Sequence, residues 1–152
     1  MLNDHDITVL NSLITTTIDS ANGFERAAED ADSGRFATVF RDFGAERRQV
    51  VAELQQTVRA LGGTPNDDGS LKADLHRRWV DLRAAISSDG DDQAVINEVE
   101  RGEDYIKAKY EEALADPKLS AGMSAVQKAF ESIRAGHDTA SALKHRMAGV
   151  SA

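Results

Sequence analysis

Hydrophobic residues recur every three or four positions in four long stretches of the chain, which is the spacing of one face of an α-helix. These stretches cover about residues 6–32, 35–61, 93–115 and 118–147, and a shorter one covers about 71–87. No stretch shows the alternation of a β-strand. The pattern predicts an all-α protein. The most regular stripe belongs to the last stretch and consists of Leu119, Met123, Val126, Phe130, Ile133, His137, Ala140, Lys144 and Met147.

The breaks between these stretches predict how the helices are connected. Short breaks at 32–35 and 115–118 favour two antiparallel helix pairs. The second stretch ends at Gly62 and Gly63, a typical C-terminal helix cap. The connection over 62–92 is long enough to run the length of a bundle. We therefore expect a ferritin-like, up-down-down-up four-helix bundle with a short extra helix in the long crossover.

Length, charge and composition exclude several classes of protein. With 152 residues, a single domain over 1–152 is expected. The net charge of −8 disfavours nucleic-acid binding, which needs a basic surface. No uncharged apolar run approaches the ~20 residues of a membrane span, and the acidic N-terminus is unlike a signal peptide. We expect a cytoplasmic protein that binds neither nucleic acid nor membrane. The absence of cysteine excludes disulfides and thiolate metal ligands.

Several local motifs occur in an order that resembles a known family. They are "LNSLI" near the start, "GFERAAE" at 23–29, "AELQ" at 52–55, "RALGGTP" at 59–65, "SLKADLHRRW" at 70–79, "ERGEDY" at 100–105 and "HD" at 137–138. The chain resembles a bacterial family of ferritin-like four-helix-bundle proteins, a domain of unknown function named after a hypothetical protein of Pseudomonas. The resemblance covers nearly the whole chain. It implies a ferritin-like fold and no particular activity.

Ferritin-like di-metal proteins carry Glu-x-x-His motifs on two helices, and this motif is absent from the sequence. A looser cluster can be assembled, because Glu25, Glu46, Glu103 and His137 fall at similar heights in the expected bundle. Their heights differ by about four residues, or about 6 Å. Three carboxylates and one imidazole are ligands that suit a single Mn, Fe or Zn ion.

An ion-pair network is the alternative interpretation of the same residues, and the missing motif favours it. Buried charges are usually paired. Arg47, Arg101 and Arg134 are all available to neutralise these glutamates. On this interpretation the protein has no cofactor; on the metal interpretation it holds Fe or Mn.

Two further features are interpreted as packing devices. His76 and Trp79 share one face of the crossover helix, where Trp79 is expected to anchor that helix to the bundle. Gly102 lies inside a helical stretch, where glycine costs about 1 kcal/mol relative to alanine. We expect Gly102 to leave a recess for a close helix contact, with the crossover helix as the proposed neighbour.

Two functions remain open from the sequence. The favoured one is a non-enzymatic bundle, stress-associated by its ferritin-like resemblance, which acts through protein contacts as a dimer or larger homo-oligomer. Val9 and Leu13 beside Ile14 give the first helix a second apolar face for such contacts. The alternative is a metal-binding ferritin relative that stores iron or reduces peroxide. Fold alone does not decide between them.

Overall fold

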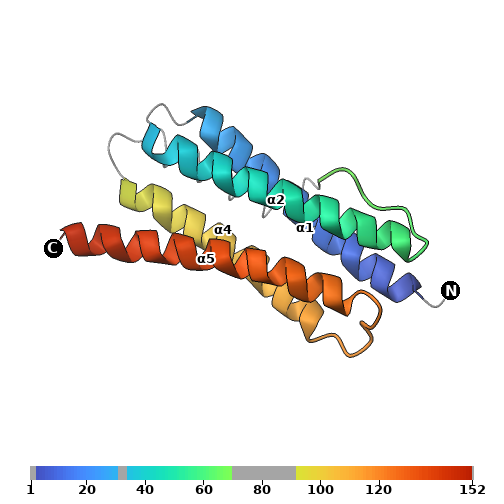
Figure 1. The fold of residues 1–152 in the computed structure, drawn as a ribbon. Helices are drawn as coiled ribbons and strands as arrows, with labels where there is room; N and C mark the ends of the chain where they lie inside the picture. Colours follow the sequence, from blue (N-terminus) through green and yellow to red (C-terminus); the bar gives the residue numbers. More distant parts are fainter. Residues whose placement is uncertain (1–2, 31–33, 70–91, 152) are drawn as a thin grey trace.

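The computed structural model describes residues 3–30, 34–69 and 92–151, and Figure 1 shows their arrangement. These residues form four α-helices: α1 (Asp4–Asp30), α2 (Gly34–Ala60), α4 (Asp92–Leu114) and α5 (Met123–Ser151). The described ranges contain helices and no strands, so the all-α prediction is confirmed. The expected crossover helix over 71–87, with His76 and Trp79, lies outside the described residues.

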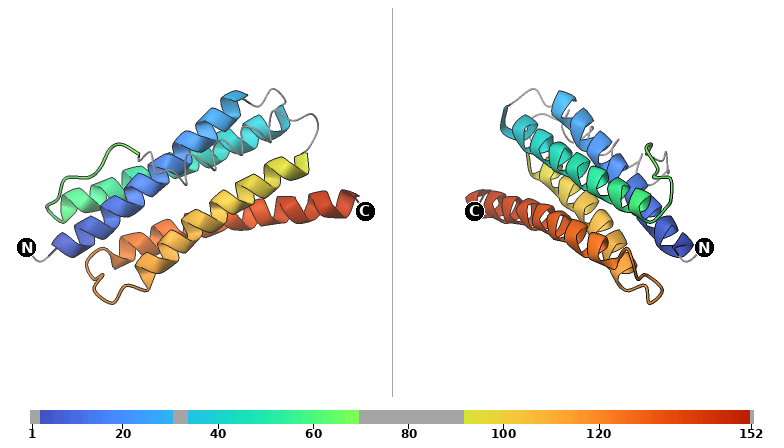
Figure 2. Two further views of the ribbon diagram at one scale, coloured as in Figure 1. Left: turned by 180° about the vertical axis from the view of Figure 1, so that it is seen from behind. Right: turned by 45° about the vertical axis from the view of Figure 1, so that its right-hand side comes forward.

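The four helices lie side by side in two antiparallel pairs (Figure 2). α1 packs along α2 and α4 along α5, while α1 also contacts α4 and α2 also contacts α5. Asn3 at the start of α1 donates a hydrogen bond to the carbonyl of Leu61 at the end of α2. Lys144 near the end of α5 reaches Glu100 in the first half of α4, with Nζ 2.8 Å from Oε1. α1 and α5 therefore run in one direction and α2 and α4 in the other.

The expected end of the second helix is confirmed. Gly62 has a φ of 89°, the left-handed conformation that glycine adopts without steric cost. The Gly63 N–H bonds to the carbonyl of Val58, and the Gly62 N–H bonds to the carbonyl of Arg59. These two bonds form a Schellman motif, which satisfies carbonyls at the end of α2.

The last helix starts later than the sequence pattern indicates. It was expected from about residue 118, but residues 115–122 form a loop and α5 begins at Met123. The reason is a contact from α1: the buried Asp6 carboxylate accepts hydrogen bonds from the N–H groups of Ser120, at 3.1 Å, and Gly122, at 2.7 Å. A carboxylate at this position caps the free N–H groups of the helix start. Asp6 thereby ties the start of α1 to the start of α5.

The core is divided into two apolar clusters along the bundle. The cluster at the end with the α4–α5 loop, here called the aliphatic cluster, includes Leu10, Leu13, Ile14, Ile18, Val50, Val51, Leu54, Val58, Ile106, Tyr110, Ala113, Leu119, Val126, Ala129 and Ile133. The cluster at the other end, here called the aromatic cluster, includes Phe24, Ala27, Ala28, Phe36, Phe40, Phe43, Val95, Ile96, Val99 and Ala140.

None of the four described helices is both long and apolar enough to cross a membrane.

Candidate functional site

A buried ion pair lies between the two apolar clusters. Arg47 on α2 is 0% exposed and Glu103 on α4 is 1% exposed, and Arg47 Nη2 lies 2.5 Å from Glu103 Oε2. Arg47 is flanked in the stripe of α2 by Phe43 and Val50, one on the aromatic side and one on the aliphatic side. The pair connects two helices that run in the same direction. It forms a charged layer between the two apolar clusters of the core.

Small and aromatic residues shape the space around this pair. Gly136 of α5 faces it, and a Cβ there would lie 2.5 Å from Arg47 Nη2 and 3.0 Å from Glu103 Oε2. The rings of Phe24 and Phe43 each have their centroid 6.0 Å from the guanidinium carbon. Gly136 thus provides room for the pair, and the two rings cover the cation at a distance suited to cation–π attraction.

Part of the pair lacks hydrogen-bond partners among the described residues, although the pair lies in an environment of low polarity. Arg47 Nε and Nη1 are buried and make no hydrogen bond to any described residue. Burial raises the pKa of Glu103, while the neighbouring Arg47 and His137 act in the opposite direction and Glu46 adds to the rise. An arginine stays protonated in proteins. Arg47 therefore remains a buried cation for which Glu103 is the immediate counter-ion.

The ion-pair interpretation of the sequence named both members of this pair, Arg47 and Glu103, and the structure confirms that they bind each other. Arg47 stands four residues after Phe43 and three before Val50, so it occupies a stripe position of the second helix. Glu103 stands four residues after Val99 and three before Ile106. A charged residue at a stripe position points into the core, and two such positions on different helices predict a buried pair.

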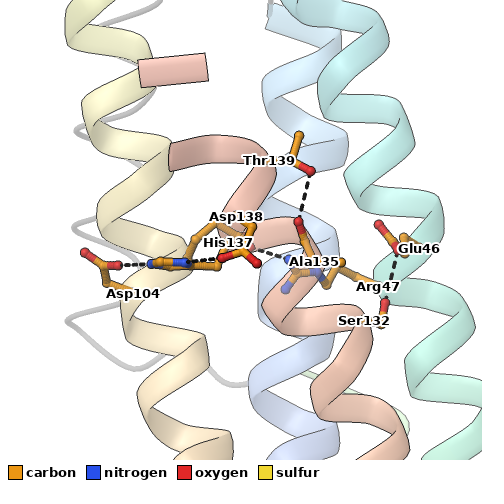
Figure 3. Close-up of polar contacts among 9 residues, drawn as sticks. Glu46, Arg47, Asp104, Ser132, Ala135, His137, Asp138 and Thr139 are labelled. Carbon is orange, nitrogen blue, oxygen red and sulfur yellow. Dashed lines mark hydrogen bonds and ion pairs between the residues drawn. The ribbon is translucent and has the colours of Figure 1, made fainter. Parts of the chain in front are cut away.

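Two of the other predicted ligands lie near the pair but engage other partners. Glu46 is exposed and accepts a hydrogen bond from Ser132 Oγ, at 3.1 Å. His137 has Nε2 2.6 Å from Asp104 Oδ1, and its side chain reaches toward α4 (Figure 3). Glu46 adjoins Arg47, which binds Glu103, and His137 contacts Asp104, the neighbour of Glu103, so Glu46, Glu103 and His137 lie at a similar level of the bundle.

The fourth predicted ligand, Glu25, is also exposed. Arg48 binds it through two contacts, with Nη2 2.8 Å from Oε1 and Nε 3.1 Å from Oε2. This bidentate contact lowers the pKa of Glu25. Arg101, another predicted partner for the glutamates, pairs with Glu98 one turn earlier on α4, at 3.1 Å.

Within residues 3–30, 34–69 and 92–151, no group of three or more His, Asp or Glu side chains is arranged to hold a metal ion. The sequence placed the four candidates at one level, but the side chains turn to separate partners. Instead of a metal site, the described residues form the ion pair between Arg47 and Glu103. Its chemistry is electrostatic and structural.

Gly102 faces open space among the described residues, because no described atom lies within 4 Å of a Cβ built there. The expected recess is therefore not filled by α1, α2 or α5. The crossover helix proposed as its neighbour lies outside the described residues. If that helix packs on Gly102, Gly102→Leu lowers the melting temperature by more than the helix-propensity change explains. A melting temperature at or above that of the parent contradicts the contact.

Gly136 is the glycine that contacts the buried ion pair, and the sequence analysis missed it. Alanine is the better helix former by about 1 kcal/mol, yet Gly136→Ala is expected to destabilise the protein by about 1–3 kcal/mol because its methyl group meets a confined guanidinium. Chemical denaturation measures the change. In an Arg47→Leu background the cost of Gly136→Ala should shrink; an equal cost in both backgrounds would show that another neighbour causes it.

A second buried polar contact lies deeper in the aliphatic cluster. Tyr110 Oη and Thr17 Oγ1 lie 2.7 Å apart, and Thr17 Oγ1 donates to the carbonyl of Leu13 at 2.6 Å. Burial raises the pKa of Tyr110 to about 12. The folded protein therefore holds this phenolic proton at pH values where the unfolded chain loses it.

This predicts a specific alkaline sensitivity. The stability associated with the neutral Tyr110 is complete below pH 10 and is lost as the pH rises toward 12, by about 2–3 kcal/mol in total. Unfolding free energies measured across this range should fall less steeply in Tyr110→Phe than in the parent. Tyr105→Phe serves as the control and keeps the steep fall, since Tyr110 is unchanged. Parallel curves for Tyr110→Phe and the parent would contradict the assignment.

The family model for a domain of unknown function (DUF2383) matches residues 5–116, so the chain belongs to this family. The match includes α1, α2 and α4, and it ends before α5, which supplies Gly136 and part of both apolar clusters. A comparison with curated proteins found no match to the chain.

Proposed function

We propose that this DUF2383 protein is a ferritin-like four-helix bundle that acts without catalysis, through self-association as a dimer or larger assembly and through contacts with other proteins. The observation that carries the proposal is the guanidinium of Arg47 in the middle of the core. Ferritin-like di-metal proteins place their metal ligands in the bundle core. Here a fixed cation stands in that region.

The electrostatics of this cation oppose a metal ion. A divalent ion approaching Glu103 would meet the positive charge of Arg47 in a poorly screened environment, where like charges repel most strongly. Displacing Arg47 from Glu103 would leave the guanidinium buried without its counter-ion, which is costly. The core is thus arranged to keep its own charges neutral.

We propose a groove between α1 and α4 as the contact surface. It has a volume of about 300 Å³ and contains Val9 and Leu13, which the sequence analysis named, together with Ala113 of α4. Val9 is half-buried and Leu13 is buried. Apolar residues in the lining of an accessible groove favour protein contacts, and Lys109, Glu112 and Asp116 add charged groups to this lining. A cytoplasmic location and a role in stress remain part of the proposal, the latter by its ferritin-like resemblance alone.

The second candidate function is a carboxylate and histidine site for Fe or Mn, used in iron storage or oxidation. It is supported by one observation: Glu46, Glu103 and His137 come from three helices and lie at a similar level of the bundle. To form this site, the side chains of Glu46 and His137 would have to rotate toward Glu103.

Elemental analysis of untagged protein, followed by anaerobic Fe(II) titration and exposure to oxygen, separates the two functions. The proposal predicts no stoichiometric metal and no oxidation signal. Stoichiometric binding that is lost in both Glu103→Ala and His137→Ala would establish the metal function instead. Sedimentation across a range of concentrations tests self-association, and a monomer at every concentration would contradict that part of the proposal.

A further inference from the structure

Two dipeptides among the described residues place an Asn or Asp directly before a glycine. They are Asn22–Gly23 in α1 and Asp68–Gly69 in the segment after α2. In both, the glycine has no side chain to hinder attack of its backbone nitrogen on the Cγ atom of the preceding residue. The sequence alone ranks Asn22–Gly23 as the more reactive, because a neutral amide can lose ammonia, whereas a carboxylate must first be protonated to lose water.

The structure protects Asn22–Gly23. Both residues lie in the interior of α1, where each backbone N–H donates to the carbonyl four residues earlier. The helical ψ of about −42° does not direct the Gly23 nitrogen at the Asn22 Cγ. Asn22 Oδ1 also accepts a hydrogen bond from Arg48 Nη2, at 2.6 Å. Attack at Asn22 therefore requires local opening of the helix.

Asp68–Gly69 lacks this protection. Both residues lie outside the helices, Asp68 is exposed, and its carboxyl group forms no hydrogen bond or ion pair with any described residue. The surrounding segment is attached to α1. The Asn66 N–H donates to Asn11 Oδ1 at 2.8 Å, and a Cβ at position 69 would collide with Asp19 Oδ1. The packing of this segment on α1 thus favours glycine at the position after Asp68.

We propose that Asp68 is a site of spontaneous backbone isomerisation to isoaspartate. The Gly69 nitrogen attacks Asp68 Cγ, the carboxyl hydroxyl leaves with the nitrogen's proton as water, and a five-membered succinimide forms. Water then opens the ring. Its addition to the main-chain carbonyl carbon of Asp68 leaves Gly69 bonded to Cγ, which is isoaspartate, and its addition to Cγ restores aspartate. The inference does not depend on the proposed function.

Isomerisation at Asp68 changes the attachment of this segment to α1. It lengthens the main chain by one methylene group between Asn66, which is bonded to Asn11, and Gly69, which lies beside Asp19. The longer chain no longer matches the span between these two contacts. We therefore expect the isomerised form to hold this segment less closely against α1.

Peptide mapping tests the proposal on folded, untagged protein incubated at near-neutral pH in water enriched in heavy oxygen. Ring opening adds one heavy oxygen to the peptide that contains Asp68, and electron-transfer fragmentation distinguishes isoaspartate from aspartate. Asp68→Glu is the matched variant. It retains the charge but would need a larger, slowly formed ring, so no isomerisation is expected at position 68. Asp89–Gly90 lies outside the described residues and falls in a different tryptic peptide.

The same measurement in guanidinium chloride separates the effect of the structure from that of the sequence. We expect isoaspartate at Asp68 at rates within about tenfold of each other in the folded and unfolded chains, since exposed loops open at little cost. Deamidation at Asn22 should be about a hundredfold or more slower in the folded chain, and faster than reaction at Asp68 in the unfolded one. The inference is overturned if no heavy oxygen enters the Asp68 peptide, if unfolding accelerates Asp68 by more than about tenfold, or if folded protein reacts at Asn22 first.

Discussion

Glu103→Gln is expected to lower the free energy of unfolding by about 3–5 kcal/mol, the cost of leaving a buried charge without its partner. The substitution retains the size of the side chain and one hydrogen-bond acceptor, so the loss of negative charge is the main change. Arg47 has two nitrogens without a hydrogen-bond partner among the described residues. It therefore depends on Glu103 for neutralisation. Urea unfolding followed by circular dichroism measures the effect.

Glu53→Gln is the matched control for this prediction. Glu53 is paired with Lys128 at 3.7 Å, and their side chains are 37% and 73% exposed. A pair of this kind contributes about 0–1 kcal/mol, so the control should stay close to the parent. If Glu103→Gln were no more destabilising than Glu53→Gln, the buried pair would not have the energetic role assigned to it.

Phe43→Ala is expected to be comparably destabilising, by about 3–5 kcal/mol, because it removes a buried ring and leaves a cavity. Phe43 is 4% exposed, and its ring stacks on Phe24 with the centroids 4.9 Å apart. It also covers the guanidinium of Arg47, with 6.0 Å between the ring centroid and the guanidinium carbon. Its loss therefore exposes the ion pair as well as weakening the aromatic cluster.

Phe43→Leu separates these two contributions. Leucine restores most of the apolar contact but offers no π face to the cation, so about 1–2 kcal/mol should be lost. The same unfolding measurement compares the two variants. A leucine variant as unstable as the alanine variant would mean that the ring face, rather than the filled volume, accounts for the stability at this position.

The helices were predictable because each has a continuous apolar face, and periodicity alone identifies such a face. The end of α2 was predictable because its glycines form a local cap. The start of α5 was not, because the group that caps it is Asp6, which lies more than a hundred residues earlier in the chain. Tertiary contacts that end or begin a helix leave no signal in the local sequence.

The sequence predicted the level of the candidate residues along the bundle and an ion pair that involves Arg47, but not the partners of the other candidate residues. Counting residues from the helix ends placed Glu46, Glu103 and His137 near one another. The direction of each side chain depends on how far each helix is rotated about its axis, and Glu46 and His137 turned toward Ser132 and Asp104. For the same reason the charged neighbours of Gly102 drew attention to it, whereas the glycine that contacts the ion pair is Gly136.

The central claim is that Arg47 and Glu103 neutralise each other in the core, and a double-mutant cycle tests it most directly. Unfolding free energies would be measured for the parent, Arg47→Leu, Glu103→Leu and the double variant. The account predicts that the double variant is less destabilised than the sum of the single variants by about 2–3 kcal/mol. Additivity to within about 0.5 kcal/mol would show that the two charges act independently, and would contradict the account.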